Sequence, residues 1–176
     1  MKKLLNAYIS MTDVLEKISS VFVITSLIVM TVLMTVQTIM RYFFATGLTW
    51  SEELTRFICC YSVMIASSIA IRHGRHLNMG FIADKLKGRS KYIYKLIIGL
   101  VCLAFYVYIL VLSIKLCRTV TGTTVATNIP FGYVYMCLPI GIVLMMITEV
   151  EQALLTIWAM IHNEEFVRIP KGGKTA

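Results

Sequence analysis

The residues best suited to chemistry in this sequence form a charged cluster between two apolar segments. The stretch 40–54 reads MRYFFATGLTWSEEL, and its ionisable side chains are Arg41, Glu52 and Glu53, with Arg56 just beyond it. Two acids and two bases beside a membrane span are costly unless they pair or reach water. The pattern therefore predicts ion pairing that fixes neighbouring segments to each other or to a partner. It indicates a membrane protein whose segments fold against each other or a partner, rather than a simple anchor.

Patterns typical of catalysis or cofactor binding are missing from the sequence. His73 and His76 stand three apart in the basic turn RHGRH, and His162 follows the last apolar run. A haem-carrying bundle needs histidines that face one another inside helices. No Ser-His-Asp pattern, Gly-rich phosphate loop or CxxC pair occurs, and the five cysteines lie in or beside apolar runs as small hydrophobic residues do. We therefore expect no enzyme activity, no metal and no cofactor.

The composition is that of a membrane protein. Of 176 residues, 58% are hydrophobic and only 15% are charged, and the mean hydropathy is +0.78. These values lie far from those of a soluble domain. The net charge of +8 does not indicate nucleic-acid binding, because the basic residues fall between and outside the apolar runs rather than along one folded surface.

The elements that must position the charged cluster are four predicted transmembrane helices in an all-α domain. The apolar run 21–40 has no charge. Its length at ~1.5 Å per residue reaches about 30 Å, the thickness of the hydrocarbon core. The run is too long for the apolar part of a cleavable signal peptide, so we expect it to be retained. The predicted spans are about 18–40, 51–71, 93–115 and 131–151, in a single domain 1–162 followed by a cytoplasmic tail 163–176.

The basic residues predict the orientation of these spans. Thirteen of them precede the first span, lie between the second and third spans or follow the fourth, and only Arg41, Arg56, Lys115 and Arg118 fall on the other side. The positive-inside rule therefore places both termini and the middle loop in the cytoplasm. Aromatic residues at the span edges, Trp50 among them, agree with this arrangement because they favour the headgroup level.

Three features concern the ends of the helices. Apolar residues recur at helical spacing within 3–17, which predicts an amphipathic helix along the inner membrane interface. The spacing of Thr49 and Glu52 predicts a capping box at the start of the second helix. For the apolar stretch 153–161, two alternatives stay open: the fourth span continues obliquely, or a second interfacial helix begins.

Small residues predict where the helices pack closely. Ser62, Ala66 and Ala70 repeat every four residues, and such a repeat lets another helix approach in lipid. This seam is either internal to the bundle or a docking face for another subunit. Pro130 and Pro139 are expected to shape the fourth helix, the second of them as a kink.

One acid is expected inside the membrane. Glu149 falls near the inner end of the fourth span, where a basic neighbour could satisfy it. The only polar residue of the first span larger than serine or threonine is the neutral Gln37. The chain is therefore poorly equipped to carry a substrate by itself.

Three motifs in a fixed order carry a resemblance to a known family. They are RYFF at 41–44 with WSEELTRF at 50–57, then IRHGRHL at 71–77 with Asp84 downstream, then Ile129-Pro130 with Tyr133 and LPIG at 138–141. Over residues 8–160 the chain resembles the small membrane subunit, the DctQ type, of tripartite ATP-independent periplasmic (TRAP) transporters.

The resemblance implies a non-catalytic subunit of a sodium-driven transporter for organic acids in the bacterial inner membrane. Its partners would be a large membrane subunit, which moves like an elevator and carries the substrate and sodium sites, and a periplasmic substrate-binding protein. The small subunit would act as scaffold or stator. The alternatives are a self-sufficient, homo-oligomeric small transporter and a membrane-bound redox or assembly factor.

The resemblance also suggests roles for two groups of residues. A network at the outer rim, within the chain or toward the large subunit, would be formed by Arg41, Trp50, Glu52, Glu53 and Arg56. Contacts at the inner face with lipid phosphates or an acidic loop of a partner would be made by Arg72, Arg75 and His76. The latter group also fits a simple topology signal.

Overall fold

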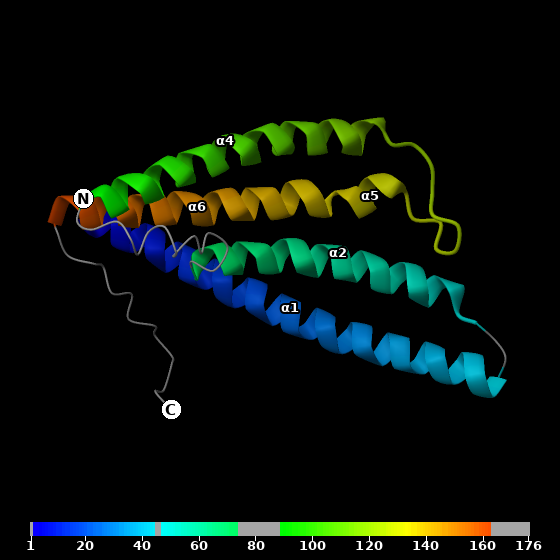
Figure 1. The fold of residues 1–176 in the computed structure, drawn as a ribbon. Coiled ribbons are helices and arrows are strands. Elements are labelled where there is room, and N and C mark those ends of the chain that lie inside the picture. Colours follow the sequence, from blue (N-terminus) through cyan, green and yellow to red (C-terminus); the bar gives the residue numbers. More distant parts are fainter. Residues whose placement is uncertain (1, 45–46, 74–88, 163–176) are drawn as a thin grey trace, which may run out of the picture.

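The computed structural model describes residues 2–44, 47–73 and 89–162, and these fold into long α-helices (Figure 1). The helices are α1 (Lys2–Phe44), α2 (Thr49–Arg72), α4 (Arg89–Thr119), α5 (Phe131–Tyr135) and α6 (Cys137–His162). Within the described ranges, four helical segments are long and apolar enough to cross a membrane: 8–44, 49–72, 92–119 and 131–160. The predicted all-α fold with four membrane-spanning helices is confirmed.

The four long helices lie side by side in the order α4, α6, α2, α1 (Figure 1). The main packing contacts join α4 to α6, α6 to α2 and α2 to α1, and a smaller contact joins α1 to α6. The start of α1 and the end of α6 lie together at one end, which we call the terminal end. The end of α1, the start of α2 and the connection after α4 lie at the opposite end, the loop end.

The row arrangement leaves much of each helix without a protein neighbour. In the most apolar window of each segment, 11% of the residues are buried in α1 and in α4, against 22% in α2 and 28% in the α5–α6 segment. Among the described residues, the buried set contains more polar than hydrophobic side chains. Long apolar side chains point outward instead, as expected where lipid replaces water.

The first helix is longer than predicted. The stretch 3–17 is not a separate interfacial helix, because it continues without a break into the span as part of α1. A helix of 43 residues is about 65 Å long, roughly twice the hydrocarbon thickness. Its N-terminal part packs on protein: Thr12 is buried, and Tyr8 donates a hydrogen bond of 3.0 Å to the carbonyl of Ile147.

The fourth span is broken near its start and continuous to its end. The helix is interrupted at Met136, between α5 and α6. Pro139 explains the position of the break, because its ring has no N–H and collides with the carbonyl four residues earlier. Pro130, with φ −58° and ψ 132°, precedes α5. At the other end α6 runs unbroken to His162, so the stretch 153–161 continues the span.

The closest helix contact was not predicted from the sequence. At Gly141 in α6, a Cβ atom would lie 2.6 Å from Cβ of Met64 in α2, which is closer than real Cβ atoms approach. In the predicted small-residue seam of α2, Ser62 is buried, and Ala66 and Ala70 are half-buried. Whether that seam serves another subunit stays a prediction.

Candidate functional site

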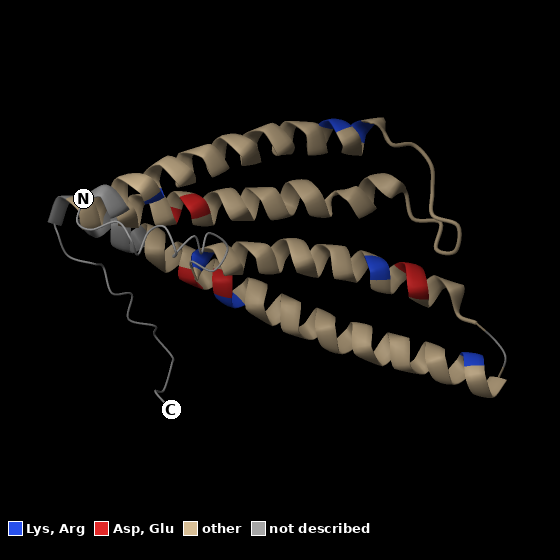
Figure 2. Ribbon diagram, viewed as in Figure 1, with Lys and Arg blue, Asp and Glu red and all other residues tan. Residues whose placement is uncertain are grey.

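The charged residues of the described chain gather in two bands, one toward each end of the row, and the helix stretches between them carry none (Figure 2). The band at the terminal end is built around Arg72, the last residue of α2. Its side chain is fully buried and contacts three carboxylates: Asp13 and Glu16 from α1, and Glu151 from α6. We call these four residues the Arg72 cluster.

All three nitrogen atoms of the Arg72 guanidinium donate hydrogen bonds. Nε donates to Oε2 of Glu151 at 2.9 Å, and Nη2 donates to Oε1 of the same carboxylate at 3.2 Å and to Oδ1 of Asp13 at 2.5 Å. Nη1 donates to Oε2 of Glu16 and, at 2.7 Å, to the carbonyl of Thr12. A planar fork with five N–H donors suits such multidentate pairing, whereas a lysine would act as a point charge. The cluster therefore fixes α1, α2 and α6 to one another.

Two further contacts strengthen this junction. Nε2 of His73, the residue after α2, lies 2.9 Å from Oε1 of Glu16. Nε2 of Gln152 donates at 2.8 Å to the backbone carbonyl of Arg72, which the helix end leaves without an intrahelical donor. Side chains from α6 and α1 thus bind polar groups at the C-terminal end of α2.

The structure corrects the prediction for Arg72. Its partners lie within the chain, and its side chain is 0% exposed, so it does not present its charge to lipid headgroups or to a partner. The other two residues of that prediction, Arg75 and His76, lie outside the described residues. A signal was present in the sequence: Asp13 and Glu16 are three residues apart in a helix otherwise poor in acids. It was missed because their partner is about sixty residues away.

The band at the loop end holds the predicted rim residues, but not as ion pairs. Oε1 of Glu52 accepts a hydrogen bond of 2.6 Å from Nε2 of Gln37, which joins α2 to α1. No ion pair between these acids and Arg41 or Arg56 is found in the part of the chain that the structure describes, and both arginines are exposed. The arginine–glutamate pairs expected within the chain are therefore absent from the described residues, and a network toward the large subunit stays a prediction.

Glu53 holds the connection between α4 and α5. Its carboxylate accepts hydrogen bonds of 3.1 Å from the backbone N–H groups of Ala126 and Thr127, and one of 3.0 Å from the Thr127 hydroxyl. Inside the connection, Thr124 and Ile129 are joined by a backbone hydrogen bond of 2.9 Å, and Asn128 adopts φ 52°. Glu53 thereby fixes a compact turn over the start of α2.

The start of α2 also differs from the prediction. Leu48, rather than Thr49, is the N-cap residue, and no side chain caps the helix. Glu52 does not form a capping box, because with Leu48 as N-cap it stands one residue beyond the position that reaches back. Its Oε1 atom instead accepts the hydrogen bond from Gln37. Trp50 is 44% exposed, in keeping with a residue at the headgroup level. Ser51 and Thr55 are buried, and their hydroxyl oxygens have no hydrogen-bond partner among the described residues.

Glu149 is the second buried acid of α6, and among the described side chains no basic residue pairs with it as the sequence suggested. It is 3% exposed, and among the described residues no donor reaches its Oε2 atom. Its Oε1 atom fills the space beside Gly99 of α4, where an added Cβ would lie 3.1 Å away. The residue thus sits at the α4–α6 contact.

The described residues contain no group of three His, Cys, Asp or Glu side chains that could hold a metal ion. What the site residues do is join helices: the Arg72 cluster at the terminal end, and Gln37–Glu52 and Glu53 at the loop end. Fold and site together define a multi-pass membrane protein whose polar residues serve helix assembly.

Comparison with known families identifies the group. Residues 30–159 match the family described as tripartite ATP-independent periplasmic transporters, DctQ component. The chain belongs to this family, whose members are permease subunits of TRAP transporters. This confirms the family that the three sequence motifs indicated.

Three similar proteins carry names within this transporter class. The sialic acid TRAP transporter small permease protein SiaQ of Vibrio cholerae is 28% identical over 104 residues, which are 58% of this chain and 60% of SiaQ. The C4-dicarboxylate TRAP transporter small permease protein DctQ of Vibrio cholerae is 28% identical over 82 residues, 47% of this chain and 35% of that protein. The isethionate TRAP transporter permease protein DctMQ of Oleidesulfovibrio alaskensis is 26% identical over 133 residues, 70% of this chain and 21% of DctMQ. Each match thus spans less than two thirds of the relative.

Proposed function

We propose that this chain is the small permease subunit of a TRAP transporter in a bacterial inner membrane, and that it acts as a scaffold for the large membrane subunit. The observation that carries this proposal is the row of four helices. A row of side-by-side helices leaves a broad face uncovered by the rest of the chain. Even the central pair is accessible there: Val63 of α2 is 57% exposed and Val150 of α6 is 37% exposed. A large membrane subunit could cover one such face without any rearrangement of the helices.

The two polar bands support a rigid scaffold. Ionic and hydrogen-bonded groups at the terminal end and at the loop end join α1, α2 and α6, and they tie the connection after α4 to α2. A component that stays still while its partner moves benefits from such fixed junctions. The relative DctMQ adds support, because a segment like this chain makes up only a fifth of that permease protein.

The remaining parts of the proposal concern direction and substrate. The distribution of basic residues favours a cytoplasmic terminal end and a periplasmic loop end. The turn held by Glu53 would then face a periplasmic substrate-binding protein. Sialic acid, C4-dicarboxylate and isethionate appear in the names of the relatives, and we propose sodium-driven uptake of an organic acid here.

The exposed rim residues suit a contact with the large subunit. Arg41, Trp50 and Arg56 all present side chains outward at the loop end. An exposed arginine without an internal ion pair can meet an acidic group of a partner at little cost. We extend the same role to Arg75 and His76 at the cytoplasmic face, toward lipid phosphates or an acidic loop.

Co-purification tests the proposal. The chain, tagged, is co-expressed with the large membrane subunit, purified in mild detergent and passed over a size-exclusion column. We expect both subunits in one peak, and the same tag on an unrelated four-span protein should capture neither. Loss of the large subunit from this peak would contradict the scaffold role. If the double variant with Arg41→Gln and Arg56→Gln leaves the complex intact, only the proposed contact of these two arginines with the large subunit is contradicted.

A further inference from the structure

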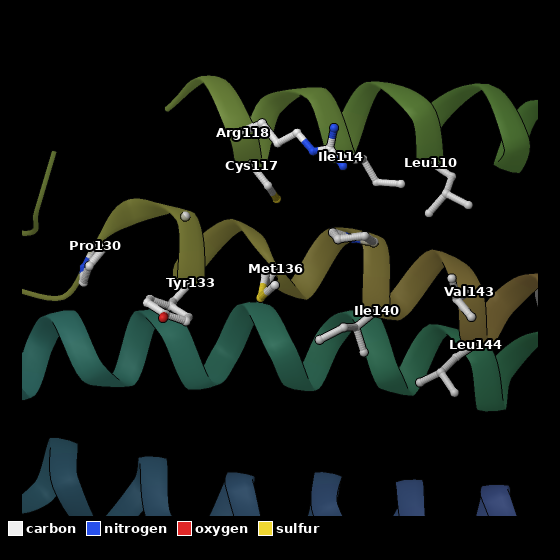
Figure 3. Close-up of a pocket in the computed structure, with 12 residues that line it drawn as sticks. Leu110, Ile114, Cys117, Arg118, Pro130, Tyr133, Met136, Ile140, Val143 and Leu144 are labelled. Carbon is white, nitrogen blue, oxygen red and sulfur yellow. The ribbon is translucent and has the colours of Figure 1, made fainter. Parts of the chain in front are cut away.

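A long apolar pocket opens between α4 and the α5–α6 segment (Figure 3). Its volume is about 830 Å³, and its walls include Leu110 and Ile114 from α4 and Ile140 and Val143 from α6. Ile140 and Val143 are 45% and 43% exposed, so the walls are open to the surroundings. We call it the α4–α6 groove. Pockets of roughly 300–1,000 Å³ can enclose most of a small ligand or a chain-like group.

The broken helix creates this groove. Pro130, Gly132 and Pro139 line the groove, and none of them presents a long side chain. The interruption at Met136 separates α5 from α6, and Met136 itself lines the groove. At Gly132, by contrast, α5 lies close to α4, because an added Cβ would be 3.5 Å from the carbonyl oxygen of Cys117. The groove is thus a product of the motif around the two prolines rather than of a missing residue.

One cation stands in this otherwise apolar groove. Arg118 lines it one residue before the end of α4, and Figure 3 shows its side chain running along the groove beside Ile114. In the described part of the chain, Arg118 forms no ion pair with a carboxylate. Arg118 is exposed, so its guanidinium is open to an anion, and its fork matches a phosphate with two parallel hydrogen bonds.

The dimensions of the groove match one leaflet of a bilayer. From Arg118 to Leu110, α4 rises by about 12 Å. Half of a hydrocarbon core is about 15 Å thick. An arginine at the helix end lies at the headgroup level, where phosphate is abundant, and the apolar walls below it lie at the depth of acyl chains. A side chain of a protein partner would need an acid at this one position, whereas every phospholipid of the leaflet supplies the phosphate.

We propose that the α4–α6 groove binds a phospholipid, with one acyl chain between α4 and α6 and the phosphate on Arg118. This goes beyond the scaffold role, and it implies that the groove side of the row stays in contact with lipid in the assembled transporter. The bound lipid fills the gap that the broken helix leaves and stabilises the α4–α6 pair at the loop end.

Native mass spectrometry of the purified full-length chain tests the site. Dioleoylphosphatidylglycerol is the probe, and dioleoylglycerol, which has the same chains but no phosphate, is its control. We expect retention of the phospholipid only, and a loss of about tenfold with Arg118→Gln. Lys115 is a cation on the same helix that does not line the groove, so the Lys115→Gln variant should retain the phospholipid. Val143→Trp should block the groove, whereas Val111→Trp, on the exposed side of α4, should not.

Two outcomes would overturn the proposal. Equal losses with Arg118→Gln and Lys115→Gln would show only general attraction of lipid by positive charge. A second measurement does not depend on the variants that fill the groove: benzoylphenylalanine at position 143 is photo-activated in membranes that contain the large subunit. Cross-linking to lipid supports the proposal, and cross-linking to the large subunit would make the groove a protein interface instead.

Discussion

The side chains of Arg72 and Glu151 are both fully buried, and two hydrogen bonds of 2.9 and 3.2 Å join the guanidinium to the carboxylate. The two residues stand at the end of α2 and in the middle of α6, 79 positions apart. With Asp13 and Glu16 of α1, this pair determines how three of the four long helices meet at the terminal end.

Removal of the arginine should be severely destabilising. Arg72→Leu leaves three acids facing one another where one cation stood, and breaking a buried ion pair from one side costs ~3–5 kcal/mol. We expect little folded protein in membranes and a thermal unfolding temperature lowered by about 6 °C or more, at ~2–4 °C per kcal/mol. Arg72→Lys should recover only part of this loss, because an ammonium cannot reproduce the fork.

The matched control for this prediction is Arg56→Leu on the same helix. Arg56 is exposed and forms no ion pair with the described carboxylates, so its loss should change the unfolding temperature by no more than about 1 °C. Similar destabilisation by Arg56→Leu and Arg72→Leu would contradict the structural role of the Arg72 cluster.

Glu53 should stabilise the turn after α4 independently of the rim arginines. Glu53→Ala removes the acceptor of two backbone N–H groups and one hydroxyl, so the turn should become less stable. Hydrogen exchange at residues 124–128 should become faster. In a double-mutant cycle with Arg56→Ala, the losses should add, since no contact joins the two side chains. A coupling above about 1 kcal/mol would instead restore the ion pair expected from the sequence.

Gly141 should be intolerant of any side chain. Gly141→Ala places a Cβ atom 2.6 Å from Cβ of Met64, so α2 and α6 must move apart at a cost of about 1–3 kcal/mol. Thermal unfolding of the purified chain measures the effect. Gly47→Ala is the control, because no atom lies within 4 Å of the added Cβ there. If both variants unfold at the temperature of the parent protein, the close approach of the two helices is wrong.

Glu149 should be replaceable by glutamine without loss of stability. The amide keeps the shape that fills the space beside Gly99 and takes away an ionisable group whose Oε2 has no donor among the described residues. We expect Glu149→Gln to unfold at the same temperature as the parent chain or at a higher one. Glu151→Gln should unfold at a lower temperature, because Arg72 then loses the charge of a buried partner. The reverse order of the two variants would contradict these assignments.

The spans could be predicted from the sequence because the bilayer fixes their length. Long apolar runs bounded by charges gave the number and approximate limits of the four helices, and three motifs gave the family. The ends were less certain. A separate interfacial helix was expected from amphipathic spacing, but the segment continues into the span, and its two acids, Asp13 and Glu16, bind Arg72.

The polar partners could not be predicted in the same way. Arg41 and Arg56 looked like partners of Glu52 and Glu53 because they are near in the sequence, yet the two acids bind Gln37 and the backbone of a turn more than seventy residues away. The row arrangement is also absent from the pattern of any one helix. In lipid, apolar side chains cover outer and inner faces alike, so periodicity does not say which face meets a neighbour.

The most direct test of the scaffold role is the mass of the purified assembly. Size-exclusion chromatography with light scattering on the co-expressed complex, corrected for detergent, counts the copies of each subunit. We expect one copy of this 19.9 kDa chain for each large membrane subunit. A stable homo-oligomer of this chain alone, formed in the presence of the large subunit and without it, would rule out the scaffold role and favour a self-sufficient transporter.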